Sequence, residues 1–262
     1  MNPGLHNLSL VDVGIAALLV IVNGALSVAL SLGLGRQLAL AAVRTVVQLL
    51  AIGYVLGWVF SVDRWYVVLP LMALMTVIAG FAGASRGAHT YAGQRLDSLG
   101  SIWISAWLVA AVGLFAVMRI QPWYAPQYVI PMLGMILGNT LTGVSLAIER
   151  MTEELTARRD RVEMALALGA TRWEAARGPA RQAARAGMIP TLNQMAIVGV
   201  VSLPGMMTGQ VLAGQSPLQA VRYQIVIMFL IAAASALGTV GAVLLTYRRL
   251  FSAEHRFIAT RL

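Results

Sequence analysis

The chain has 262 residues, of which 59% are apolar and only 11% are charged, whereas soluble domains carry roughly 25% charged residues. A soluble fold of this size would have too few polar residues to cover its surface, so a membrane protein is expected and a soluble enzyme is not. All 19 basic residues are arginine and cysteine is absent, which excludes a lysine-containing phosphate loop, lysine catalysis, disulfides and cysteine-ligated metals.

Seven stretches are long and apolar enough to cross a bilayer, which takes about 20 residues of helix. The first stretch is too long for the core of a signal peptide, so it is retained as a span. The sequence therefore predicts an all-α membrane protein of about seven transmembrane helices, organised as a single transmembrane permease domain over residues 1–262. The predicted spans are residues 11–34, 38–60, 66–84, 101–118, 128–148, 192–213 and 221–247.

The distribution of arginine predicts the orientation of these spans. Arginine is enriched in the cytoplasmic loops of membrane proteins. If the N-terminus lies outside, most arginines fall in inner loops and the tail, so the C-terminus is expected in the cytoplasm. This placement also accounts for the net charge of +9 without nucleic-acid binding. The inner arginines are Arg36, Arg86, Arg95, Arg150, Arg158, Arg159, Arg161, Arg172, Arg177, Arg181, Arg185, Arg248, Arg249, Arg256 and Arg261.

Residues 149–191 form the longest polar segment and are predicted to be a cytoplasmic loop. A helical run over 150–168 meets Gly169, a residue typical of helix C-termini. Thr171 and Glu174 then have the spacing of a capping box that opens a second helix. This helix, turn and helix would form an elbow able to dock in a groove of another protein. The alternative is an amphipathic helix pair lying on anionic headgroups, although such a pair needs no glycine hinge and fresh cap.

The elbow also carries a recognisable motif. Glu163-x-Ala165-x-x-x-Gly169 resembles the EAA signature of ABC-transporter permeases, the loop that docks on the nucleotide-binding subunit. The resemblance implies that the elbow couples the chain to an ATPase. The expected coupling residues are Glu163, Ala165, Leu166, Gly169, Ala170 and Thr171.

A broader resemblance covers nearly the whole chain. Its motifs, in order, are Arg44-x-x-x-Gln48-Leu49, Pro131-Met-Leu-Gly134-Met-Ile-Leu-Gly138-Asn139, Leu166-Ala-Leu-Gly169-Ala-Thr171, Leu203-Pro-Gly-Met-Met-Thr-Gly-Gln210 and Tyr223-Gln224-Ile225. They resemble the FetB (YbbM) family of membrane permeases. That resemblance implies a bacterial inner-membrane permease without its own enzymatic activity or cofactor, paired with a FetA-type ATPase that binds ATP and magnesium. Iron export is the implied bacterial role, but plant relatives are linked to aluminium tolerance, so the substrate stays open.

Several polar or kinked positions inside the predicted spans are candidates for a translocation pathway. Arg44 and Gln48 lie one turn apart on one helix face; Arg44 either extends to the interface or faces a pore or another helix. Pro204 would break the sixth span, as in transporter binding sites, or make a simple packing kink. The glycine pairs Gly134/Gly138 and Gly205/Gly209 are expected to be close-packed helix faces.

Methionine is concentrated near the same two motifs. Met132, Met135, Met206 and Met207 are either soft thioether ligands or flexible filler. Oxygen ligands could come from Asn139, Gln194 and Gln210. No metal site is predicted from them, and the histidines His6, His89 and His255 share no ligand spacing.

Apart from Asp12 at the N-terminal end of the first predicted span, the spans contain no Asp, Glu or His, and this absence bears on the mechanism. Proton-coupled carriers usually relay protons through such residues, so an external energy source is expected. By analogy with ABC transporters, a homodimer with two ATPase subunits would complete the pathway. The alternatives are a self-sufficient channel or secondary carrier, and a signalling subunit, which would need a large extracytoplasmic domain.

Overall fold

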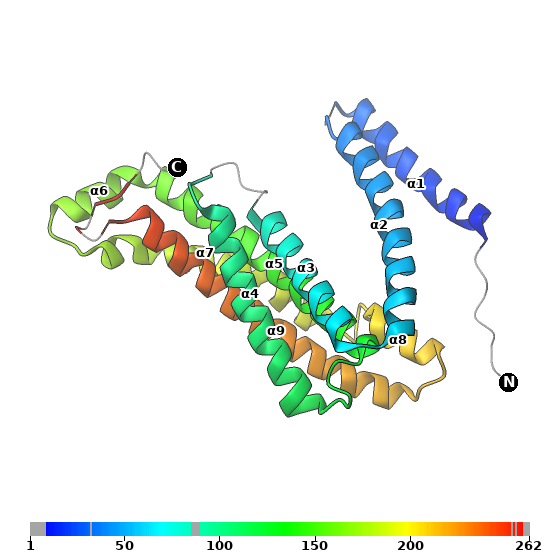
Figure 1. The fold of residues 1–262 in the computed structure, drawn as a ribbon. Coiled ribbons are helices and arrows are strands. Elements are labelled where there is room, and N and C mark those ends of the chain that lie inside the picture. Colours follow the sequence, from blue (N-terminus) through cyan, green and yellow to red (C-terminus); the bar gives the residue numbers. More distant parts are fainter. Residues whose placement is uncertain (1–8, 32, 85–89, 253, 255, 259–262) are drawn as a thin grey trace. The chain divides into compact units, whose positions relative to one another are not determined.

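The computed structural model describes residues 9–31, 33–84, 90–252, 254 and 256–258 (Figure 1). Within these ranges the chain forms nine α-helices and one π-helical segment, so the predicted all-α fold is confirmed. Two compact units divide at Asp63: residues 1–63 and residues 64–262. The prediction that all 262 residues make one permease domain stays a prediction.

The first unit is a helical hairpin of α1 (Leu10–Ala29) and α2 (Gly35–Val62). Ser9 caps α1 through a capping box, in which the Ser9 backbone N–H donates to the Asp12 carboxylate at 2.8 Å. The first predicted span extended to residue 34, but α1 ends earlier because Ser31 (φ 52°) and Gly33 (φ 69°) turn the chain.

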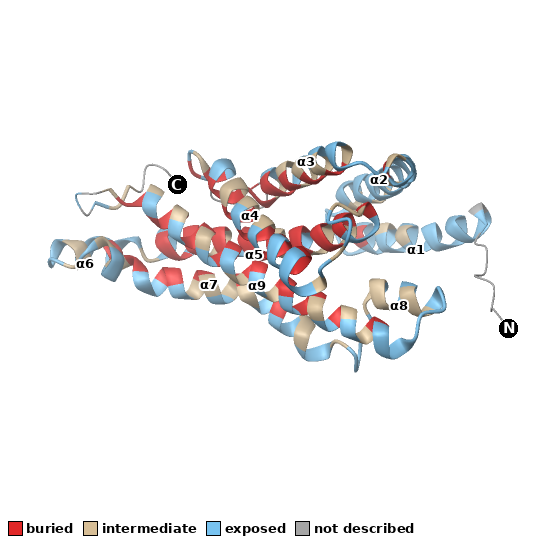
Figure 2. Cartoon of the chain, turned by 60° about the horizontal axis from the view of Figure 1, so that its bottom comes forward, coloured by how far each residue is buried: buried red, intermediate tan, exposed pale blue. Residues whose placement is uncertain are grey.

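The second unit is a bundle built around two long helices, α5 and α9, which pack against each other and against α4 and α7. Its buried residues follow the facing sides of these helices (Figure 2), with Ile136 and Leu155 of α5 and Ile227 of α9 fully enclosed. The elements of this unit are α3 (Trp65–Ala84), α4 (Gln94–Ala111), the π-helix η1 (Val112–Met118), α5 (Pro126–Ala157), α6 (Arg159–Ala167), α7 (Arg172–Ile197), α8 (Gly205–Leu212) and α9 (Pro217–Leu250).

A close helix crossing in this bundle uses glycines other than the predicted pairs. A Cβ on Gly187 of α7 would lie 2.5 Å from the carbonyl oxygen of Gly143 in α5, so both positions require glycine. A Cβ on Gly138, Gly205 or Gly209 would meet no described atom within 4 Å, and one on Gly134 would make ordinary contact with Met75. The expectation that these two pairs are close-packed faces is therefore wrong within this chain.

Among the residues that the structure describes, six helices are long and apolar enough to cross a membrane. They correspond to six of the seven predicted spans and make the chain a multi-pass membrane protein. The remaining stretch, residues 192–213, is not one helix: it comprises the end of α7, a turn, and α8. The helix stops because Gly199 adopts φ 84° and its N–H donates to the Ser202 carbonyl at 2.9 Å. Pro204 is therefore not the break itself but the N-cap of α8.

The polar segment after the fifth predicted span is more helical than expected. Helix α5 continues past Ile148 to Ala157, and α7 runs without interruption through residue 191. The predicted run over 150–168 is divided at Arg158, whose backbone (φ −111°, ψ 23°) ends α5 and begins the short helix α6. Neither glycine nor proline marks this division in the sequence.

Candidate functional site

The predicted elbow is present between α6 and α7. Gly169 has φ 91°, a left-handed conformation that favours glycine. Its N–H donates to the Leu166 carbonyl at 3.1 Å, and the Ala170 N–H donates to the Ala165 carbonyl at 3.0 Å. These two bonds form a Schellman motif, which satisfies the last carbonyls of α6 and turns the chain sharply. The predicted C-terminal cap at Gly169 is confirmed.

The predicted capping box opens α7 directly after this turn. The Thr171 backbone N–H donates to the Glu174 carboxylate at 2.7 Å, and the Glu174 N–H donates to the Thr171 hydroxyl at 3.3 Å. The bond from the Thr171 backbone lowers the pKa of Glu174 below its ordinary value, because it favours the charged carboxylate. Two caps joined by Ala170 leave the elbow little conformational freedom.

The tip of the elbow exposes apolar side chains. Leu168 is 82% exposed and Met164 is 59% exposed. Glu163 is also exposed and pairs with Arg159 one turn earlier at 2.8 Å, while Ala165 and Leu166 are half-buried. An exposed leucine and methionine next to polar residues form a surface typical of a protein contact.

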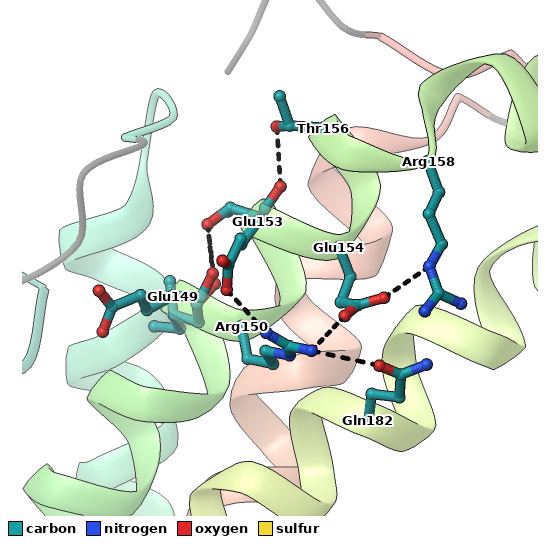
Figure 3. Close-up of polar contacts among 9 residues, drawn as sticks. Glu149, Arg150, Glu153, Glu154, Thr156, Arg158 and Gln182 are labelled. Atoms are coloured by element: carbon teal, nitrogen blue, oxygen red, sulfur yellow. Dashed lines mark hydrogen bonds and ion pairs between the residues drawn. The ribbon is translucent and has the colours of Figure 1, made fainter.

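Behind the tip, an ion cluster joins the end of α5 to α7 (Figure 3). Glu154 is only 5% exposed, and it accepts from Arg150 and, at 2.9 Å, from Arg158. Gln182 of α7 completes the cluster: with its amide nitrogen turned toward Glu154 it donates at 2.8 Å, and its oxygen accepts from Arg158 at 3.1 Å. This cluster holds the extension of α5 and the first half of α7 together as one arm.

A second set of contacts ties the start of α7 to the end of α9. Arg172 donates to the Ser252 carbonyl at 3.1 Å and lies over the Tyr247 ring, 5.8 Å from its centroid. Trp173 packs edge-on against the same ring, with centroids 5.3 Å apart. The elbow and the C-terminal end of α9 are therefore in direct contact.

The end of α9 is bound in turn to α4. Arg249 donates to both carboxylate oxygens of Asp97, at 3.0 and 2.8 Å, and Asp97 is 5% exposed. Gly93 lets the guanidinium approach, since a Cβ there would lie 2.5 Å from the Arg249 guanidinium carbon. Contacts thus run without interruption from the elbow through α9 to the beginning of α4.

A cavity of about 510 Å³ lies where the broken segment meets α9. We call it the break cavity. Pro204 and Met207, both predicted as pathway residues, line it together with Met195 and Met228. The backbone N–H of Gly199 donates to the Ser202 carbonyl and that of Val200 donates to the Ile197 carbonyl, so neither continues the hydrogen-bond pattern of an α-helix. Irregular backbone of this kind is tolerated at membrane depth where it lines protein or a cavity.

Gln224 is the polar side chain in the lining of the break cavity. It is 6% exposed, and its side-chain oxygen has no hydrogen-bond partner among the described residues. A buried amide oxygen without a hydrogen-bond partner costs free energy. Such an oxygen is typical of a position at which a ligand or a water molecule binds. In the sequence, Gln224 stands out only as part of the motif Tyr223-Gln224-Ile225; its position one turn into the last predicted span is the signal that marks it as a candidate.

The remaining pathway candidates are not brought into this cavity. Met206 and Gln210 lie on α8 but do not line it, and the buried side-chain oxygen of Gln210 has no partner among the described residues. Met132, Met135 and Asn139 lie on α5, where Asn139 donates to the Met135 carbonyl of its own helix at 2.9 Å.

Arg44 and Gln48 are exposed on α2 of the first unit. Among the described residues, no group of three or more His, Asp or Glu is placed to hold a metal ion. His6, His89 and His255 fall outside the described residues.

Comparison with known proteins places the chain in a family. The sequence profile of the uncharacterised protein family UPF0014 matches residues 10–251. The chain belongs to the UPF0014 family. This UPF0014 protein is 44% identical to the UPF0014 membrane protein slr1647 of Synechocystis sp. over 87% of its own length and 88% of the relative's.

Two further relatives match along most of their length. The UPF0014 protein is 33% identical to the Escherichia coli protein described as probable iron export permease protein FetB, over 98% of both chains. It is 35% identical to the UPF0014 membrane protein YjkA of Bacillus subtilis, over 88% of this chain and 91% of the relative. No solved structure matches the chain. The resemblance drawn from the motifs thus corresponds to a family of membrane proteins that includes a relative named as an iron export permease.

Proposed function

We propose that this chain is the permease subunit of an ABC transporter in a bacterial inner membrane, exporting iron or a related metal with ATP hydrolysed on a separate FetA-type subunit. The observation that carries the proposal is the doubly capped elbow with its exposed apolar tip. Support for the cargo comes from the full-length relative described as an iron export permease.

The elbow is proposed to receive the movement of the ATPase. Leu168 and Met164 would enter a groove on that subunit, and the cluster around Glu154 would make the arm of α5 and α7 move as one body. The contacts of Arg172 and Trp173 with the end of α9 would carry the movement to that helix. Because α9 also forms a wall of the break cavity, the same displacement would reshape it.

The break cavity is proposed to be part of the translocation pathway. Met195, Met207 and Met228 offer polarisable thioethers, and Gln224 offers an unpartnered oxygen. One copy supplies only one such wall, so two permease chains and two ATPase subunits are proposed to make the complete transporter. The chain itself would bind neither ATP nor magnesium.

Co-purification tests the proposed partnership. The tagged chain is co-expressed with a FetA-type ATPase, extracted in mild detergent and captured, in parallel with Leu168→Asp. We expect the ATPase to be captured with the original chain and at least ten-fold less with Leu168→Asp, while both chains reach the membrane in equal amounts. Equal capture with both chains would contradict docking at the elbow, and no capture with either would contradict the partnership.

A further inference from the structure

Three arginines in the first half of α7 differ from those around the elbow in forming no ion pair with a described carboxylate. Arg177, Arg181 and Arg185 follow one another at four-residue intervals and are all exposed. Among the described residues they form no ion pair, whereas Arg150, Arg158, Arg159 and Arg249 each pair with a carboxylate. Like charges at this spacing repel each other on a helix, so an anion that neutralises them would be bound favourably.

A groove of about 740 Å³ runs beside this row of arginines, between α7 and α9. We call it the α7–α9 groove. Arg177, Arg181, Trp173 and Glu174 line it on the α7 side, and the aliphatic residues Val240, Val243 and Leu244 line it on the α9 side. The Glu174 carboxylate is occupied by its capping bonds to Thr171, and the two guanidinium groups outnumber this single carboxylate. One wall therefore suits an anionic group and the other suits a hydrocarbon chain.

The level of the α7–α9 groove is set by neighbouring contacts. A Cβ on Gly143 of α5 would lie 2.9 Å from the Thr239 hydroxyl of α9, so these residues share one level. The fifth predicted span ends at Ile148, a little over one turn beyond Gly143. Residues 240–244 of α9 therefore lie at the inner edge of the predicted membrane region, where arginine and tryptophan are typical interfacial residues.

We propose that the α7–α9 groove binds an anionic phospholipid from the cytoplasmic leaflet. Arg177 and Arg181 hold its phosphate, since guanidinium groups bind phosphate oxygens in pairs, and an acyl chain lies along Val240, Val243 and Leu244. Basic pockets between membrane helices on the cytoplasmic side are known to hold anionic headgroups. The aliphatic wall, contributed by a candidate membrane span, favours a lipid over the acidic surface of a soluble protein.

Lipid titration followed by native mass spectrometry tests the site independently of transport and of the ATPase. The delipidated full chain is titrated with phosphatidylglycerol or phosphatidylcholine, and the apparent Kd of the first bound lipid is measured. We expect phosphatidylglycerol to bind at least ten-fold more tightly than phosphatidylcholine. The double variant Arg177→Gln/Arg181→Gln is expected to weaken phosphatidylglycerol binding about thirty-fold, the effect of losing two interfacial charges.

Two further variants separate the groove from general charge. Gly178→Leu fills it without altering charge, and a Cβ there would meet no described atom within 4 Å. We expect it to weaken phosphatidylglycerol binding about ten-fold, because a leucine would displace roughly two methylenes of acyl contact. Arg95→Gln/Arg161→Gln removes the same charge elsewhere and is expected to leave the Kd within two-fold. Equal affinity for the two lipids would overturn the proposal, and so would unchanged phosphatidylglycerol binding by the groove variants. A groove variant that binds phosphatidylglycerol normally but no longer captures the ATPase would assign the groove to the ATPase instead.

Discussion

Gly169 is the single residue on which the elbow depends most directly, because its φ of 91° and its place in the Schellman motif both disfavour a side chain. A left-handed backbone costs a residue with a Cβ about 1–2 kcal/mol. A β-branched residue is the most restricted of all at this conformation.

Gly169→Val is therefore expected to distort the elbow while leaving the spans intact. ATPase capture in the co-purification assay should fall at least ten-fold, with the amount of chain in the membrane unchanged. Gly100→Val is the matched control, since Gly100 lies in α4 and a Cβ there would meet no described atom within 4 Å. Normal ATPase capture by Gly169→Val would show that docking does not depend on the conformation of the elbow.

Met207 and Met206 are adjacent residues with different surroundings, which makes them a natural pair. Met207 lines the break cavity and Met206 does not. If the cavity carries the cargo, Met207→Leu should reduce ATP-dependent metal efflux several-fold and Met206→Leu should have little effect, because leucine replaces methionine at small cost in packing. Efflux is measured in proteoliposomes containing both subunits. Equal efflux from the two variants would mean that Met207 has a packing role and does not contact the cargo.

At the scale of elements, the arm of α5 and α7 depends on one buried carboxylate. Glu154 accepts from Arg150, Arg158 and Gln182, so its removal leaves Arg158 without its carboxylate partner and Arg150 with Glu153 alone. Both arginines are about 40% exposed, and water therefore compensates part of the loss.

Glu154→Gln is expected to destabilise the arm by about 1–2 kcal/mol, less than for a fully buried pair. Hydrogen exchange should increase in residues 150–182 and stay unchanged in α3. Glu153→Gln serves as the control, because Glu153 is 57% exposed and forms a single pair with Arg150; its effect should stay below about 0.5 kcal/mol. Similar exchange in the two variants would contradict the role of the cluster.

The elements that sequence predicted best are those with local signals. Gly169 and the spacing of Thr171 and Glu174 identify the elbow because caps are determined by neighbouring residues. The end of α7 could not be located in this way. Pro204 is the obvious helix breaker in the sequence, yet α7 ends before Gly199, whose N–H donates to the Ser202 carbonyl instead of to a helix carbonyl.

Contacts between distant elements left no sequence pattern. The Asp97–Arg249 pair and the Gly143–Gly187 crossing join segments far apart in the chain. Each involves residues that look unremarkable alone, and only the packing of α4, α5, α7 and α9 brings them together. For the same reason sequence selected Met206 and Met207 equally and passed over Met195 and Met228.

For the whole molecule, the number of membrane crossings decides whether the two ends of the chain lie on the same side of the membrane. The six long apolar helices in the described part of the chain give an even number, but the end of α7, the turn and α8 together can return the chain across the membrane before α9 begins. Seven crossings agree with an outside N-terminus and a cytoplasmic C-terminus, as the arginine distribution predicts.

Single cysteines can test this topology cleanly, since the chain has none of its own. Ser9→Cys and Gln215→Cys should react with an impermeant maleimide in intact cells, because both positions lie at predicted outer ends. Ser252→Cys should react only after the cells are opened. Labelling of Ser9→Cys and Ser252→Cys from the same side would require an even number of crossings.

Dependence on a separate ATPase is tested most directly by measuring metal flux in proteoliposomes that contain the chain alone or with the ATPase. The chain is expected to move no iron unaided, and to do so with the ATPase present only when ATP is supplied. Iron flux through the chain without the ATPase and without ATP would contradict the proposal that the chain is a permease driven by a separate ATPase.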